Sequence, residues 1–129
     1  MVHSLQSHNS SRPLANLLFA MAPTLAFCTW ATAEPLRCDV GPITRILGGT
    51  QWQVTSCNDG YSLVFATVNG NPAMPFVFIV QRAEGTAKIS GEGNGSKEHS
   101  AAAYEELASL TATQFDELVQ ATILAENKK

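Results

Sequence analysis

The chain has 129 residues, of which 45% are apolar and 15% are charged, so its composition excludes a disordered or fibrous protein and predicts one packed domain. Its formal net charge is −3, and its lysines and arginines form no cluster. Binding to the backbone of nucleic acid or to anionic lipid requires such a cluster. We therefore expect no nucleic-acid partner, and no membrane partner for the folded domain.

Residues 1–33 have the pattern of a removable signal peptide. A polar start without acidic residues precedes the apolar segment Leu14–Phe27, and a small-x-small cleavage motif follows at Ala31–Ala33. We expect cleavage after Ala33 and Sec-type export to the periplasm or the medium. An uncleaved membrane anchor is the alternative, because residues 14 to 33 have about the length of a spanning helix.

Export would leave two of the three cysteines, since Cys28 lies within the leader. An oxidising compartment favours pairing of the remaining two, so we predict a disulfide between Cys38 and Cys57. Two separately buried thiols are the alternative. A metal site is disfavoured because no second pair of Cys or His residues has ligand spacing. We predict one small, disulfide-bonded domain over residues 34–129, with no metal and no cofactor.

The first part of this domain contains glycine and proline pairs that interrupt regular structure, followed by one segment with a strand pattern. Gly41-Pro42 and Gly48-Gly49 interrupt residues 34–50 too often for a long element, so we expect an arm with one short strand or turn at 43–47. From Thr50 to Ser56, polar and apolar residues alternate. This period of two predicts a half-buried strand.

Three further strands follow, separated by turn signals. The turns are expected at Asn58–Gly60, Asn69-Gly70 and Glu84-Gly85. The strands are expected at residues 61–68, 76–80 and 86–90. The segment 76–80 is apolar throughout, which predicts a central strand with both faces covered. Strands joined by short turns indicate an antiparallel meander of about four strands.

A helical period replaces the strand period after Ser96, which we expect to be the N-cap of a first helix. The apolar stripe of that helix is predicted to contain Ala101, Tyr104, Leu107 and Ala108. Thr111 and Gln114 match a capping box that opens a second helix. Its stripe is predicted to contain Phe115, Leu118, Val119, Thr122 and Ile123. The predicted fold class is α+β, with the sheet followed by two amphipathic helices packed on one face.

His99 is the only histidine after the leader, so a Ser-His or Cys-His centre would have to be built around it. No nucleophile elbow lies nearby. The carboxylates of the two helices are expected opposite the apolar stripes, in solvent: Glu105, Glu106, Asp116 and Glu117. We predict no catalytic site, and a small hydrolase or lyase centred on His99 is the alternative.

The glycine-rich run Gly91–Lys97 lies between a predicted strand and a predicted helix, where backbone N–H groups can hold an anion. Its spacing matches no known phosphate loop, and Glu92 would repel phosphate. A flexible connection is the simpler interpretation. An anion or small-molecule site would use Gly93, Gly95, Ser96 and Lys97.

The clearest candidate for a functional surface is one face of the sheet. Strand alternation places Val77 and Ile79 opposite the neighbouring phenylalanines, and Val64 joins them from the preceding strand. Two helices can cover only one face, so we predict that the Val64, Val77 and Ile79 side meets a second copy or another exported protein. The alternative is that the 34–50 arm and the Trp52 ring cover this face and the protein is monomeric.

These observations favour a small exported, non-catalytic binding or interaction protein. The arrangement of a leader followed by a short disulfide-bonded α+β domain is similar to that of many small exported bacterial proteins. The two alternatives stated above, an enzyme centred on His99 and an anion or small-molecule binder that uses the glycine-rich run, belong to different functional classes.

Overall fold

The computed structural model describes Ala26 and residues 34–129. The predicted leader, apart from Ala26, lies outside the described residues, together with its cleavage site and Cys28. Residues Glu34–Lys129 cluster as one compact unit.

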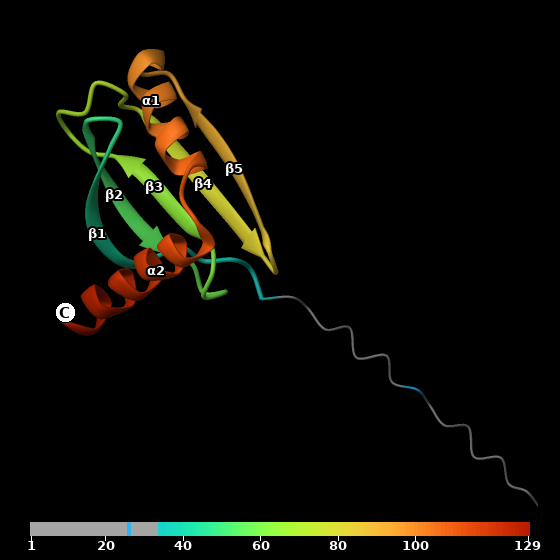
Figure 1. Ribbon diagram of the computed structural model, residues 1–129. Helices are drawn as coiled ribbons and strands as arrows, with labels where there is room; N and C mark the ends of the chain where they lie inside the picture. The colour runs from blue at the N-terminus through green and yellow to red at the C-terminus, as the bar shows by residue number, and fades with distance from the viewer. Residues whose placement is uncertain (1–25, 27–33) are drawn as a thin grey trace, which may run out of the picture. The chain divides into compact units, whose positions relative to one another are not determined.

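Five strands form a single antiparallel sheet, and two helices follow them in the chain (Figure 1). The strands lie in the order in which they occur in the sequence, β1-β2-β3-β4-β5. Their bounds are β1 Val40–Leu47, β2 Thr50–Ser56, β3 Leu63–Thr67, β4 Phe76–Ala83 and β5 Thr86–Gly93. The helices are α1 Lys97–Ala108 and α2 Ala112–Asn127. The predicted α+β meander with two C-terminal helices is confirmed, and β1 is the strand beyond the four expected.

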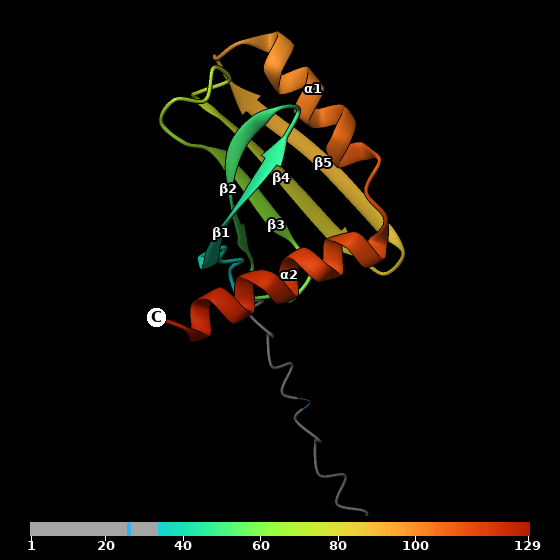
Figure 2. The ribbon, with the colours of Figure 1, turned by 60° about the vertical axis from the view of Figure 1, so that its left-hand side comes forward.

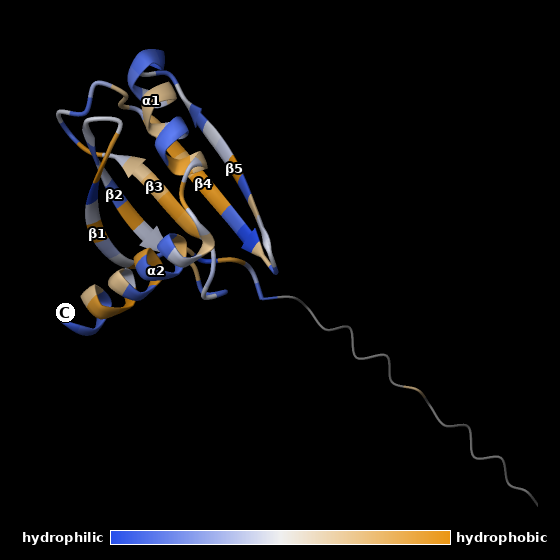
Figure 3. Ribbon diagram, in the orientation of Figure 1, coloured by the Kyte–Doolittle hydropathy of each residue, from blue (hydrophilic) through white to orange (hydrophobic). Residues whose placement is uncertain are grey.

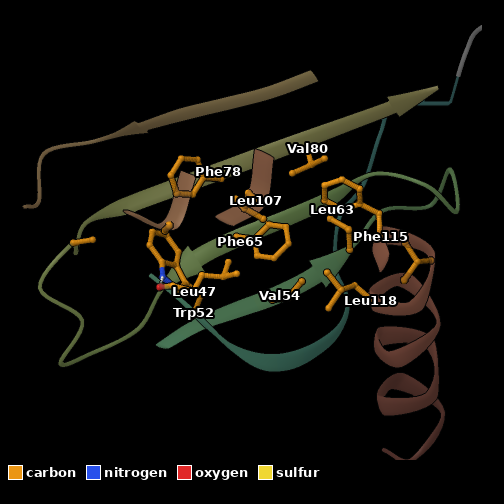
Figure 4. Packing of buried hydrophobic residues seen from close by; sticks show 13 residues of the cluster. Leu47, Trp52, Val54, Leu63, Phe65, Phe78, Val80, Leu107, Phe115 and Leu118 are labelled. Carbon is orange, nitrogen blue, oxygen red and sulfur yellow. Dashed lines mark hydrogen bonds between the residues drawn. The ribbon is translucent and has the colours of Figure 1, made fainter. Parts of the chain in front are cut away.

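Both helices lie on the same face of the sheet, which we call the inner face (Figure 2). Alternate side chains of the three central strands point to this face and are buried there: Trp52, Val54, Leu63, Phe65, Phe78 and Val80. Figure 4 shows them gathered between the sheet and residues of the two helices, such as Leu107 and Phe115. The hydrophobic core of the described residues therefore lies on one side of the sheet.

Two expectations about covering the sheet are wrong: the alternative that the 34–50 arm and the Trp52 ring cover the face opposite the helices, and the expectation that both faces of the strand at 76–80 are covered. Trp52 alternates in phase with Val54, so its ring lies in the inner-face core, where its Nε1 donates to the Leu47 carbonyl oxygen at 3.2 Å. The expected arm is instead incorporated into the sheet, because Ile43–Leu47 pair with β2 as part of β1. β4 is also covered on one face only, since Phe78 is 2% exposed and Ile79 is 38% exposed.

The predicted disulfide between Cys38 and Cys57 is present. Hydrogen bonds beside it join the same two segments, because Arg37 and Asn58 exchange one bond in each direction, at 3.0 and 2.8 Å. The residues that precede β1 are thereby tied to the turn that follows β2.

The buried stripe of α1 differs from the prediction. Ser100, Ala103 and Leu107 are buried, whereas Tyr104 is 47% exposed. Because residues 101–103 are all alanine, the sequence does not show which of them faces the core. A tertiary contact determines that Ala103 does. The β1–β2 hairpin approaches α1 so closely that a Cβ atom at Gly48 would lie 2.6 Å from the Ala103 nitrogen.

The prediction for α2 is confirmed from its first residue. Thr111 and Gln114 form the reciprocal capping box, with bonds of 2.8 and 3.2 Å between side chain and backbone. The buried stripe contains Phe115, Leu118, Val119 and Thr122, with Ile123 half-buried. The helix is also attached through a buried polar contact, because the hydroxyl groups of Thr122 and Ser56 of β2 share a hydrogen bond of 2.6 Å.

Arg82 of β4 fixes the start of α2 and was not singled out in the sequence. Its side chain is 8% exposed and forms an ion pair with Asp116 at 2.7 Å. The guanidinium group also donates to the Tyr61 carbonyl oxygen at 3.1 Å and lies 5.3 Å from the centre of the Phe115 ring. The prediction that Asp116 is only a solvated helix residue is therefore incomplete.

Candidate functional site

The outer face of the sheet, opposite the helices, has an apolar centre. The strand register places Val64 of β3 beside Ile79 of β4, and Ala66 beside Val77. We call these four residues the outer patch. Ile79 is 38% exposed and the other three are half-buried. No helix or strand of residues 34–129 packs over them (Figures 1 and 2), so the structure brings together the three residues that the sequence singled out.

Polar residues border the outer patch on both sides. On β2, Gln53 is paired with Ala66 and Thr55 with Val64. On β5, Ser90 is paired with Ile79, and Glu92 with Val77. Figure 3 shows the same gradient along the sheet, with β3 and β4 more hydrophobic than the edge strands. An apolar centre within a polar rim is the usual composition of a protein-binding surface.

A shallow hollow of about 330 Å³ lies at the β4–β5 side of the outer patch. Its lining consists of Val77, Ile79, Ser90, Gly91 and Glu92. The hollow exists because β5 carries short side chains and a glycine next to the branched side chains of β4.

The glycine-rich run packs tightly instead of forming a flexible loop. A Cβ atom at Gly91 would lie 2.8 Å from the rings of Phe76 and Phe78, and one at Gly95 would overlap the Ala73 carbonyl group. Close packing therefore accounts for both glycines. Gly91 and Gly93 belong to β5, so the expected flexible connection is much shorter than the sequence suggested.

The same run leaves little capacity for an anion. The backbone N–H groups of Asn94 and Ser96 donate to the carbonyl oxygens of Pro75 and Pro72, each at 3.0 Å. An anion site needs such groups to point at the ligand. The sequence proposed four adjacent residues for this site, Gly93, Gly95, Ser96 and Lys97. The N–H groups of Ser96 and of the neighbouring Asn94 are already bonded to carbonyl oxygens of the protein.

His99 is half-buried in the first turn of α1. Its Nδ1 lies 2.9 Å from the Ser96 hydroxyl oxygen, so the serine at the N-cap bonds to the imidazole in place of a helix N–H group. No carboxylate of the described residues hydrogen-bonds to this histidine. A nucleophilic serine needs an imidazole that a third group orients, and the described residues place no such group there.

Two of the helix carboxylates accept hydrogen bonds from backbone N–H groups near the two ends of β1. Glu106 accepts a hydrogen bond from the Gly48 N–H at 2.7 Å, and Glu126 accepts one from the Gly41 N–H at 3.0 Å. The bond from the Lys129 side chain and that from Gly41 lower the pKa of Glu126 below its usual value of 4.5. Within residues 34–129 no three His, Cys, Asp or Glu side chains gather as metal ligands.

A second hollow, of about 410 Å³, lies on the inner face between α1 and β4. Phe76, Phe78 and Tyr104 provide its aromatic wall, and Gly91, Ser100, Ala101 and Glu105 complete it. Phe78 belongs to the buried core, whereas Phe76 is partly buried and packs against it.

The comparisons with known proteins leave this surface without a precedent. No family model, no curated protein and no solved structure matches the chain. Neither α1 nor α2 has the combination of length and apolar character that crossing a membrane requires. The interpretation of function therefore depends on the geometry of the described residues.

Proposed function

We propose that this is an exported, non-catalytic interaction protein that binds another exported protein through the outer patch. The observation that carries the proposal is the exposed apolar centre formed by Val64, Val77 and Ile79 on a face that no described element covers. Contiguous apolar surface of this kind, rimmed by polar residues, usually marks an association site.

The position of the core strengthens this interpretation. Both helices pack against the inner face, and the large buried side chains all point to that side. The outer patch therefore contributes little to the core, and its branched apolar side chains are not required by the packing of α1 or α2. Binding to a partner gives these side chains a role, because association would remove them from water.

Export is supported by two independent features. The first is the leader pattern of residues 1–33, with its cleavage motif ending at Ala33. The second is the bond between Cys38 and Cys57, since disulfides persist in oxidising compartments and are rare in the cytosol.

A photo-reactive amino acid at position 79 tests the binding surface directly. We expect light to cross-link the protein to one partner from the exported compartment when the probe replaces Ile79. The same probe at Gln120, which is exposed on α2, should give no such product. Cross-links from both positions, or from neither, would contradict the proposal.

A matched pair of substitutions then tests whether the apolar character matters. Ile79→Lys should reduce capture of that partner at least tenfold, whereas Gln81→Lys, on the same strand and the same face, should leave it within about twofold. Both variants should retain the thermal unfolding transition of the original protein. Turnover of a substrate panel that is lost in His99→Ala would instead favour the small hydrolase or lyase.

A further inference from the structure

β5 is an open edge of the sheet. It pairs with β4 over eight consecutive residues, from Phe76 with Gly93 to Ala83 with Thr86, without a bulge. Among its residues only Ile89 is half-buried, and all the others are exposed. β5 contains no proline, and no described element covers its outer side. A long, regular strand edge of this kind is a template for pairing with another strand.

The backbone groups that this edge presents can be identified from hydrogen bonds in its neighbour. The N–H groups of Phe76 and Arg82 in β4 donate to the side chains of Thr67 and Ser62, on the β3 side. In an antiparallel ladder, successive residues direct their N–H and C=O groups to opposite sides. The odd-numbered residues of β4 therefore bond to β5, and within β5 Ala87, Ile89 and Gly91 direct their N–H and C=O groups outward.

The side chains on the outer face of β5 are complementary to themselves. Lys88, Ser90 and Glu92 point to this face at a spacing of two residues, with the serine in the middle. The three ion pairs of the described residues involve neither Lys88 nor Glu92. In an antiparallel pair of two β5 strands, a two-fold axis at Ser90 places each Lys88 opposite Glu92 of the second copy.

We propose that the protein forms a homodimer by antiparallel pairing of β5 with β5 of a second copy, with the two-fold axis at Ser90. Ile89 and Gly91 then exchange backbone hydrogen bonds with Gly91 and Ile89 of the second copy. The lysine and glutamate occupy the pairs that carry no backbone bonds, in which side chains approach most closely.

The charges also select this register over its neighbours. A two-fold axis at Lys88 or at Glu92 would place like charges opposite each other, which is destabilising. An axis at Ile89 or Gly91 would leave both charged residues without an oppositely charged partner. Only the Ser90 register satisfies both charges in each copy. α1 leaves the edge accessible, because its Tyr104 ring lies against Phe78 of β4, one strand inward.

The dimer would join the two sheets into one of ten strands and place two outer patches on the same side. The two proposals remain separable, because the dimer forms through a strand edge and the proposed partner binds a strand face. Ile79→Lys should reduce capture of the partner at least tenfold and leave the dimer intact. Lys88→Glu, at a residue that lies outside the outer patch and the lining of its hollow, should weaken the dimer and leave capture of the partner intact.

Sedimentation equilibrium of the purified protein, from about 1 to 300 µM, tests the dimer with charge-reversal variants. Lys88→Glu and Glu92→Lys should each weaken dimerisation about tenfold or more, since each creates two like-charged pairs across the axis. The double variant Lys88→Glu/Glu92→Lys should restore the dimer to within about threefold. Arg45→Glu, which has the same charge change on the β1 edge, should leave the dimer unchanged.

Amide hydrogen exchange locates the contact independently. In the dimer, the N–H groups of Ile89 and Gly91 should exchange more slowly as concentration rises, and they should lose this dependence in Lys88→Glu. A protein that stays monomeric throughout, or a dimer that persists in both single variants, would overturn the proposal. Failure of the double variant to recover, with its unfolding transition intact, would also overturn it.

Discussion

The two edges of the sheet are built in opposite ways. The pairing of β1 is interrupted between Val40 and Ile43, next to Pro42. α2 packs against this strand, and its Glu126 carboxylate accepts a hydrogen bond from the Gly41 N–H group. β5 is regular and uncovered over its whole length. Bulges, prolines and covering helices are the usual means of preventing strand edges from pairing. The β1 edge is therefore protected against strand pairing, and the β5 edge is available for it. This difference is the one expected if the proposed dimer forms through β5 alone.

Breaking the disulfide should have the largest effect on the closed edge. Cys38 precedes β1 and Cys57 follows β2, and the bond closes a loop with a sequence separation of 19 residues. In the chain-entropy model, closure of such a loop contributes about 3 kcal/mol to the free energy of unfolding. The midpoint of thermal unfolding, followed by circular dichroism, should fall by about 15 °C on reduction. An unchanged transition, with both thiols shown to be alkylated, would mean that the bond does not support β1.

A pair of glycine substitutions sharpens the comparison at the β1–β2 hairpin. Gly48 and Gly49 both have positive φ, +58° and +79°, but only Gly48 would place a Cβ against the backbone of α1. Gly49→Ala should therefore lower the free energy of unfolding by about 1 kcal/mol from strain alone. Gly48→Ala should lower it by about 2 kcal/mol or more, because the helix must also move. Equal losses in urea titration would show that α1 does not depend on this contact.

The smallest expected effect concerns Glu126, which holds the start of β1. Its pKa in the folded protein is lowered, so its bonds stabilise the fold above pH 4.5 and this contribution is lost as the pH falls through the lowered pKa. Glu126→Gln should lower the free energy of unfolding slightly at pH 7 and have little effect below the lowered pKa, so the pH dependence of stability should be flatter in that acidic range. Glu117→Gln, an exposed residue of the same helix, should retain the original profile. Identical profiles for the two variants would exclude a role for this carboxylate.

Strong local signals in the sequence accounted for most of the fold. Alternation from Thr50 to Ser56 and the turn signals located β2 to β5, and the capping box located the start of α2. The length of β1 was underestimated because Gly41-Pro42 and Gly48-Gly49, near its two ends, are residue pairs typical of loops. The orientation of α1 could not be derived, since it is determined by the approach of Gly48 to the helix and not by the pattern of α1 itself.

The candidate site was also predicted only in part, because local patterns reveal the faces of strands but not the order of strands in the sheet. Alternation alone placed Val64, Val77 and Ile79 on one face, and the number of helices showed that one face would stay open. The open edge of β5 could not be seen, because it depends on which strands end the sheet. The packing role of Gly91 was also hidden, since the two phenylalanines that exclude a side chain there precede it by 13 and 15 residues.

The buried guanidinium group of Arg82 links segments of the domain that could otherwise separate in local unfolding. It joins β4, the segment between β2 and β3, and the first turns of α2 through its bonds to Tyr61, Ala112 and Asp116. Detaching the start of α2 would break the bond from Arg82 to the Ala112 carbonyl oxygen and its ion pair with Asp116. We therefore expect the start of α2 to open together with β4 in local unfolding. α1 is held by the buried Ala103 and Leu107 and by the bond from Gly48 to Glu106, and it takes part in none of the three ion pairs of the described residues.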